Sequence, residues 1–177
     1  MNKLFEQKGN KKEKIKELTR LNYVLDEIDL SSINNEDLVI IPYKCTMGKT
    51  TVGIGGTYYP DGTEIRMTDR PTLNSVMQMY FFHKAKAIKE AKSLFQDYEW
   101  NRIGKIRQMV IIDLIFNMGL GGVNKFPTML AYLKAGKYLE ASLELQYTNP
   151  TTKVLSSYFN QVGQRAVDNC LKIKEGK

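Results

Sequence analysis

Three residues in the first third of the chain could cooperate in acid–base chemistry: Glu36, Cys45 and Thr51. Glu36 follows "SSINN", Cys45 lies in the polar turn "YKCTMGK", and Thr51 begins a stretch rich in threonine and glycine. Eight residues separate the glutamate from the cysteine, and five separate the cysteine from the threonine. Cleavage of a glycosidic bond needs one acid that protonates the leaving oxygen and a second group that acts on water or on the developing cation. We therefore expect these residues to converge on one wall of a cleft.

The other reactive side chains do not suggest a second site. Cys45 and Cys170 are far apart and form no CxxC pair, and His83 is the only histidine. A disulfide framework or a zinc site is therefore not expected, and we predict neither a metal nor a cofactor. We interpret His83 as a helix-surface imidazole and Trp100, the only tryptophan, as a packing residue.

The composition indicates a basic globular protein. The chain has 177 residues, with 26 Lys and Arg against 19 Asp and Glu, a formal net charge of +7. Such an excess predicts an anionic partner: nucleic acid, a membrane surface or an acidic polymer such as a bacterial wall. The longest apolar run, "MVIIDLIF", is interrupted by Asp113, and the start "MNKLFEQKGNKKEK" lacks the apolar stretch of a signal peptide. We expect synthesis in the cytoplasm and no stable membrane insertion.

The first part of the chain predicts helices. Apolar residues recur three or four apart over residues 11–28, which indicates one amphipathic helix. Ser31 and Ser32 could cap a further short helical segment that ends near Leu38. Residues 1–29 are therefore interpreted as an N-terminal helical extension.

β-Branched residues and turn signals then dominate residues 39–67. "TTVGIGGTYY", "PDG" and "TEIRM" predict a hairpin whose turn is 60–62. After "TDRPT" the sequence predicts helices to the end of the chain, one of them apolar on nearly all sides and broken at Gly119. We predict an α+β fold with a small β-hairpin lobe at about 39–68, a larger all-helical lobe at about 70–177 and a cleft between them.

The three candidate residues lie in a longer stretch, "EDLVIIPYKCTMGKTTVGIG", that resembles the catalytic signature of the phage-type lysozymes, the endolysin muramidases. The spacing of Glu, Asp or Cys, and Thr is similar, as are the tyrosine–lysine before the cysteine and the Thr-x-Gly-x-Gly after it. Downstream, "FNMGLGGVNKFPTML" and "GQRAVDNCL" resemble two later segments of the family in the same order. The resemblance runs from about residue 30 to the C-terminus and implies a lysozyme-like catalytic domain over 30–177.

The resemblance implies a role for each candidate residue. Glu36 would protonate the oxygen of the β-1,4 bond between N-acetylmuramic acid and N-acetylglucosamine, and Thr51 would hold the attacking water. Cys45 takes the position that aspartate usually has, where it would stabilise positive charge on the sugar or orient the water. A thiol with a pKa of about 8.5 is mostly neutral unless the site lowers that pKa. The resemblance leans to inversion of configuration, and the role of Cys45 stays open between stabiliser, base and nucleophile.

Four further residues are carried over as supporting or substrate-binding residues. Arg165 would pair with Glu36, and Asn117 would lie along the cleft near the substrate. Tyr43 and Gly55 belong to the matched stretch around the catalytic residues. The sequence departs from the family at Gly56, where a histidine usually follows Thr-x-Gly-x-Gly.

The resemblance implies peptidoglycan as partner, no nucleic acid, a monomer, and degradation of the bacterial wall for host lysis. The enzyme would be made in the host cytoplasm and act after release, with a holin pore as one route. A lytic transglycosylase, which would use Glu36 alone and leave 1,6-anhydro products, is an alternative that Thr51 argues against. A degenerate wall-binding or virion structural module is the second alternative, and a nucleic-acid binder is a distant third.

Overall fold

The computed structural model describes residues 3–177, which form two compact units. The first unit ends at His83 and the second begins at Lys84, so the division falls within the long helix α3 (Leu73–Ser93). Most residues are helical and the sheets are small, so the predicted α+β class is confirmed.

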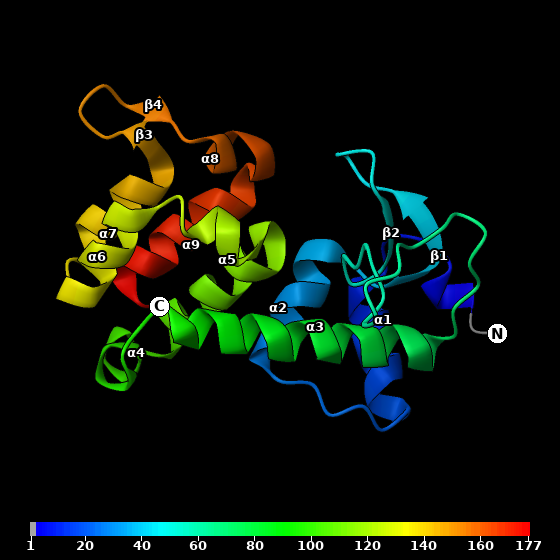
Figure 1. Cartoon of the computed structure of the whole chain (residues 1–177). Coiled ribbons are helices and arrows are strands. Elements are labelled where there is room, and N and C mark those ends of the chain that lie inside the picture. Colours follow the sequence, from blue (N-terminus) through cyan, green and yellow to red (C-terminus); the bar gives the residue numbers. More distant parts are fainter. Residues whose placement is uncertain (1–2) are drawn as a thin grey trace. The chain divides into compact units, whose positions relative to one another are not determined.

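The first unit combines short helices with a two-stranded sheet (Figure 1). Its elements before α3 are η1 (Lys3–Phe5), α1 (Lys11–Arg20), α2 (Glu27–Glu36), β1 (Val39–Lys44) and β2 (Thr50–Gly53). The fully buried Phe5, Leu18 and Ile33 come from η1, α1 and α2, so the N-terminal segment contributes to the core of this unit. From α3, the buried Tyr80 hydroxyl donates a hydrogen bond of 2.9 Å to Asp29 on α2.

The predicted single helix over residues 11–28 is wrong, because the chain breaks between α1 and α2. Asn22 has a φ of 64°, a conformation that ends a helix. Asp26 then caps α2: its side chain accepts from the backbone of Asp29, and the Asp29 carboxylate accepts from the backbone of Asp26. Ser31 and Ser32 are therefore interior residues of α2, and their predicted capping role is also wrong.

The observed hairpin precedes the predicted one. β1 and β2 are antiparallel, with Tyr43 opposite Thr51. The turn between them begins at Cys45, whose carbonyl accepts from Gly48 at 2.8 Å, and Gly48 has a φ of 74°. A turn followed by a left-handed glycine is a common hairpin connection.

The turn predicted at 60–62 is present, but regular strands do not flank it. The Gly62 amide donates to the Tyr59 carbonyl at 2.9 Å, and one isolated bridge joins Tyr58 to Glu64. Gly53 and Gly55 have φ values of 68° and 73°, which turn the chain out of β2 before a longer strand can form.

Helices make up most of the second unit. After α3 they are α4 (Asp97–Ile103), α5 (Lys105–Val123), α6 (Pro127–Ala135), α7 (Tyr138–Gln146), α8 (Ser157–Val162) and α9 (Gln164–Glu175), with the short strands β3 (Tyr147–Asn149) and β4 (Val154–Leu155). α9 packs on α5 and α7 (Figure 1). α4, α8 and the β3–β4 hairpin were not predicted, because they are short and lack a clear hydrophobic period. Trp100 is 8% exposed and contacts Phe95, as its predicted packing role requires.

The buried helix predicted around "MVIIDLIF" is α5, and it kinks at Gly119, where φ is 73° and ψ is 168°. By length and composition alone α5 is apolar enough to cross a membrane, although the sequence analysis expected Asp113 to preclude this. Core helices of soluble proteins have the same property. In the structure, Ile111 and Leu114 of α5 are fully buried, Asp113 forms an ion pair with Arg165, and 33% of the apolar stretch is buried.

Candidate active site

Glu36 is the last residue of α2 and is half-buried. The helix ends there because Asp37 adopts a φ of 66°. Gly55 lies directly against the Glu36 carboxyl group: a Cβ at Gly55 would be 3.2 Å from Cγ, 3.3 Å from Cδ and 3.4 Å from Oε2. The first unit therefore brings together Glu36 and Gly55, which are 19 residues apart in the sequence.

This close approach predicts that Gly55→Ala greatly lowers activity. The new methyl group would crowd the Glu36 carboxyl, and the positive φ of Gly55 disfavours any side chain. We expect the turnover number on peptidoglycan to fall about tenfold, because the carboxyl group must shift by a few tenths of an ångström and a shift of about 1 Å costs on the order of 10²-fold. Gly62→Ala, also at positive φ but with open space around it, is the matched control. Equal turnover by the two variants would contradict the prediction.

Cys45 and Thr51 lie close together at the turn end of the β1–β2 hairpin. The Cys45 amide donates to the Lys49 carbonyl at 3.0 Å, and the Thr51 hydroxyl lies 3.2 Å from the same carbonyl oxygen. The Thr51 side chain also hydrogen-bonds to the Cys45 thiol. Thr51 is buried and Cys45 is half-buried. The hydroxyl can thus donate its single proton either to the carbonyl or to the sulfur.

The turn lowers the pKa of the Cys45 thiol. Burial alone would raise the pKa of the thiol, but hydrogen bonds from the Met47 amide, the Thr51 hydroxyl and the Lys49 backbone together lower that pKa below its ordinary value. The second cysteine behaves in the opposite way, because burial raises the pKa of Cys170 to about 11. The two thiols of the protein therefore differ strongly in expected reactivity.

A thiol-labelling experiment tests this difference. In the folded protein we expect iodoacetamide to alkylate Cys45 at least tenfold faster than Cys170, because the thiolate is the reacting species and Cys170 is only 6% exposed. Peptide mass spectrometry over time gives both rates, and Cys45→Ala shows that the fast site is lost. Equal alkylation rates of the two cysteines in the native protein would contradict the expected difference. Rates that become equal only in urea would confirm that the difference comes from the folded structure.

Tyr43 lies opposite Thr51 and close to the candidate acid. Burial, together with the negative charges of Glu36 and Cys45, raises the pKa of Tyr43 to about 12. The Lys8 ammonium group stands 4.2 Å from the centre of the Tyr43 ring. Tyr43 is therefore a neutral hydrogen-bonding group beside Glu36 and Cys45 at physiological pH.

Gly56, the position where the family usually has histidine, is closely approached by the flexible end of the Met79 side chain, which a side chain at Gly56 would have to displace. A Cβ there would be 2.6 Å from the Met79 Cε atom and 3.3 Å from the Val52 carbonyl. Met79 of α3 thus fills the space, and the Gly56 and Val52 backbones exchange two hydrogen bonds. The one histidine, His83, lies on α3 as predicted, where its ring contacts Tyr58 with centroids 4.6 Å apart.

Arg165, at the start of α9, is held within the second unit. Its Nε and Nη2 groups donate to the two carboxylate oxygens of Asp113 at 3.1 and 2.7 Å. Asn169 also donates to Asp113 and to the Tyr158 hydroxyl, so four side chains form one network. The pairing of Arg165 with Glu36 stays a prediction. The role of Asp113 was not predicted. Its position as the single charge in an apolar run was the signal that could have indicated it.

Asn117 is exposed on α5, two residues before the kink at Gly119. Its predicted place along a substrate cleft stays a prediction.

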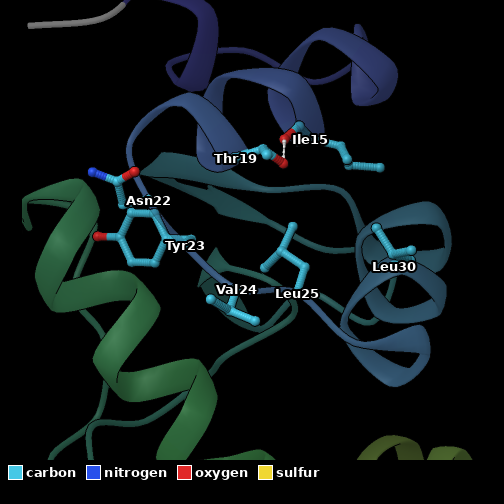
Figure 2. A pocket seen from close by; sticks show the side chains of 7 residues that line it. All are labelled: Ile15, Thr19, Asn22, Tyr23, Val24, Leu25 and Leu30. Carbon is cyan, nitrogen blue, oxygen red and sulfur yellow. Dashed lines mark hydrogen bonds between the residues drawn. The ribbon is translucent and has the colours of Figure 1, made fainter.

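A hollow of about 580 Å³ lies in the N-terminal part of the first unit (Figure 2). Its lining is mostly apolar and comes from α1, the following loop and α2: Ile15, Thr19, Asn22, Tyr23, Val24, Leu25 and Leu30. It contains none of the candidate catalytic residues and no charged side chain. Within residues 3–177, no group of three or more His, Cys, Asp or Glu side chains could hold a metal ion.

The fold and the site define a lysozyme-like α+β protein, with a carboxyl group at a helix end and a thiol–hydroxyl pair on a hairpin. The family model described as phage lysozyme matches residues 34–165, most of the chain, and this protein belongs to that family. The resemblance inferred from the sequence is thereby confirmed, and membership supports a peptidoglycan-lysing function of the muramidase type. No curated protein matches the chain. The matched range includes Glu36, Cys45 and Thr51 and ends at Arg165.

Proposed function

We propose that this protein hydrolyses the β-1,4 bond between N-acetylmuramic acid and N-acetylglucosamine in peptidoglycan. The observation that carries this proposal is the Glu36 carboxyl group held against Gly55, in the same compact unit as the Cys45–Thr51 pair. A carboxylic acid and a second group that handles water are the two requirements of glycoside hydrolysis. Membership of the phage lysozyme family supports the substrate class.

In this mechanism Glu36 donates its proton to the leaving O4 atom of N-acetylglucosamine as the bond to C1 of N-acetylmuramic acid breaks. A water molecule held by the Thr51 hydroxyl attacks C1 from the opposite side. Its proton passes to the Cys45 thiolate, and configuration at C1 is inverted. The lowered pKa of Cys45 supports this role, because a thiolate can both accept the proton and face the positive charge that develops on the sugar.

The biological setting belongs to the same proposal. The enzyme would be made in the cytoplasm of the bacterial host and would act as a monomer on the wall after release, with a holin as one route. Wall degradation would then lyse the host. The net charge of +7 supports attraction to an anionic polymer such as the wall.

The test is mass spectrometry of the fragments that the protein releases from purified peptidoglycan, compared with those from its Glu36→Gln variant. We expect hydrated fragments that end in reducing muramic acid, and their loss in the variant. Anhydro-muramic ends would instead identify a lytic transglycosylase, and no release by either protein would favour a wall-binding module. NMR of the first product gives its anomeric configuration, for which inversion predicts the α anomer.

A further inference from the structure

A buried ion pair lies immediately beside the candidate acid. The Lys14 side chain on α1 is 0% exposed and the Asp37 side chain is 4% exposed. The Lys14 ammonium donates to Asp37 Oδ1 at 2.8 Å and to the Gln7 carbonyl at 2.6 Å. Asp37 is the residue that follows Glu36. Burial of two opposite charges at this point is a feature that the proposed reaction does not itself use.

The N-terminal segment supplies most of the bonds to the Asp37 carboxylate. Oδ1 accepts from Lys14 and from the amide of Leu38, and Oδ2 accepts from the amide of Gly9. Thus two of the three donors, Lys14 and Gly9, lie between residues 3 and 20. α1 also packs on α2 and η1 packs on β1 (Figure 1). The family match begins only at residue 34, so Lys14, Gly9, η1 and α1 lie outside it, whereas Asp37 and β1 lie within it.

Asp37 needs this support because of its backbone. Its φ of 66° and ψ of 174° fall in a region that is essentially restricted to glycine. A residue with a side chain persists there only when its surroundings hold it. The turn at Asp37 ends α2 and thereby sets the direction of the last residue of the helix, Glu36, whose carboxyl group lies against Gly55.

We propose that Lys14 is a positioning residue for the acid: its ion pair with Asp37 holds the turn that places the Glu36 carboxyl against Gly55. Residues 3–20 then help to hold the candidate acid in position and are not an accessory extension. The effect of Lys14 on the position of the Glu36 carboxyl group is inferred from the structure alone. The effect on turnover rests on the proposed function.

Three variants test the proposal. Lys14→Met keeps the length of the side chain but leaves the Asp37 carboxylate without its cation. The double variant Lys14→Met/Asp37→Gly removes both charges and gives the turn a residue that adopts positive φ without strain. Lys16→Met, on the same helix but with a side chain 73% exposed, is the matched control. Lys14→Gln, which retains a donor, is the milder substitute if Lys14→Met does not fold.

Two measurements test the positioning role of Lys14 separately from the proposed hydrolysis of peptidoglycan. The first is the nuclear Overhauser effect between the Gly55 Hα and Glu36 Hγ protons, which needs no activity. We expect it in the native protein, weakened or lost in Lys14→Met, and regained in the double variant. The second is turnover of peptidoglycan, for which we expect kcat to fall on the order of 10²-fold in Lys14→Met with little change in KM. The double variant is expected to recover most of this loss.

The outcomes differ for the two claims. A folded Lys14→Met protein with an unchanged Gly55–Glu36 Overhauser effect and unchanged kcat would overturn the positioning role. A folded double variant with an Overhauser effect as weak and a kcat as low as those of Lys14→Met would also overturn it. The turn at Asp37 would then not connect Lys14 to the position of Glu36. If the native protein releases no fragments from peptidoglycan, the proposed function fails, and the Overhauser effect still decides whether Lys14 positions Glu36.

Discussion

The Glu36→Gln variant is expected to lose about 10³-fold in kcat on purified peptidoglycan while it stays folded. A positioned general acid contributes about 10²–10⁴-fold, and the amide has no proton to donate to the leaving oxygen. The substitution keeps the shape of the side chain, so the packing against Gly55 can persist. We expect KM to change little, because the lost interaction is one made in the transition state.

A matched control separates loss of the acid from loss of charge. Glu13→Gln removes a carboxylate from α1, where the side chain is 59% exposed and pairs only with the neighbouring Lys16 at 2.9 Å among the contacts described. This variant is expected to retain native turnover. Release of reducing muramic acid is measured for both variants, and circular dichroism checks that both are folded. A Glu36→Gln protein with more than about a tenth of native turnover would assign the acid role to another group.

The candidate site was predictable from the sequence as far as it depends on local spacing. Cys45 was expected in a polar turn, and the structure places it at the start of the β1–β2 turn, which precedes the predicted hairpin. The helix that ends at Glu36 was expected from a cap at Ser31 or Ser32, whereas Asp26 caps it. The chemical state of the site residues was not predictable in this way. The lowered pKa of Cys45 depends on where the amide of Met47 and the hydroxyl of Thr51 point, which residue types alone do not specify.

The elements of the fold were predicted correctly where hydrophobic periods are long. The prediction was wrong where backbone angles determine the end of a helix or strand. α3 and α5 are long and strongly patterned, and both were predicted. The break between α1 and α2 was missed, because Leu21 and Leu25 continue the apolar stripe across a loop that begins with a left-handed Asn22. The ion pair of Lys14 with Asp37 spans 23 residues of sequence and leaves no local signal in it.

The Lys14→Met variant is expected to be less stable by about 3–5 kcal/mol in the free energy of unfolding at neutral pH. Removal of one partner of a buried ion pair leaves an uncompensated charge in the interior, which typically costs this amount. Urea unfolding followed by circular dichroism measures the change. Lys16→Met, whose exposed pair contributes little, is expected to stay within about 1 kcal/mol of the native protein. Equal stability of the two variants would show that the Lys14–Asp37 pair is not a source of stability.

The same pair predicts how stability depends on pH. Burial alone would raise the pKa of Asp37, but the hydrogen bonds from Lys14, Gly9 and Leu38 outweigh it and lower the pKa below its ordinary value. A carboxyl group whose pKa is lower in the folded state contributes stability above its unfolded pKa of about 4 and loses this contribution as the pH falls through the folded pKa.

The native protein should therefore lose unfolding free energy below about pH 4, and Lys14→Met/Asp37→Gly should lose less over the same range. The double variant is expected to be near native stability at neutral pH, because an ion pair removed as a whole leaves no buried charge. Urea unfolding at about pH 5 and about pH 3 gives the two differences. Equal losses of unfolding free energy in both proteins would assign the acid sensitivity to other carboxylates. A smaller loss in the double variant would show that the Lys14–Asp37 pair stabilises the fold and loses this effect when Asp37 is protonated.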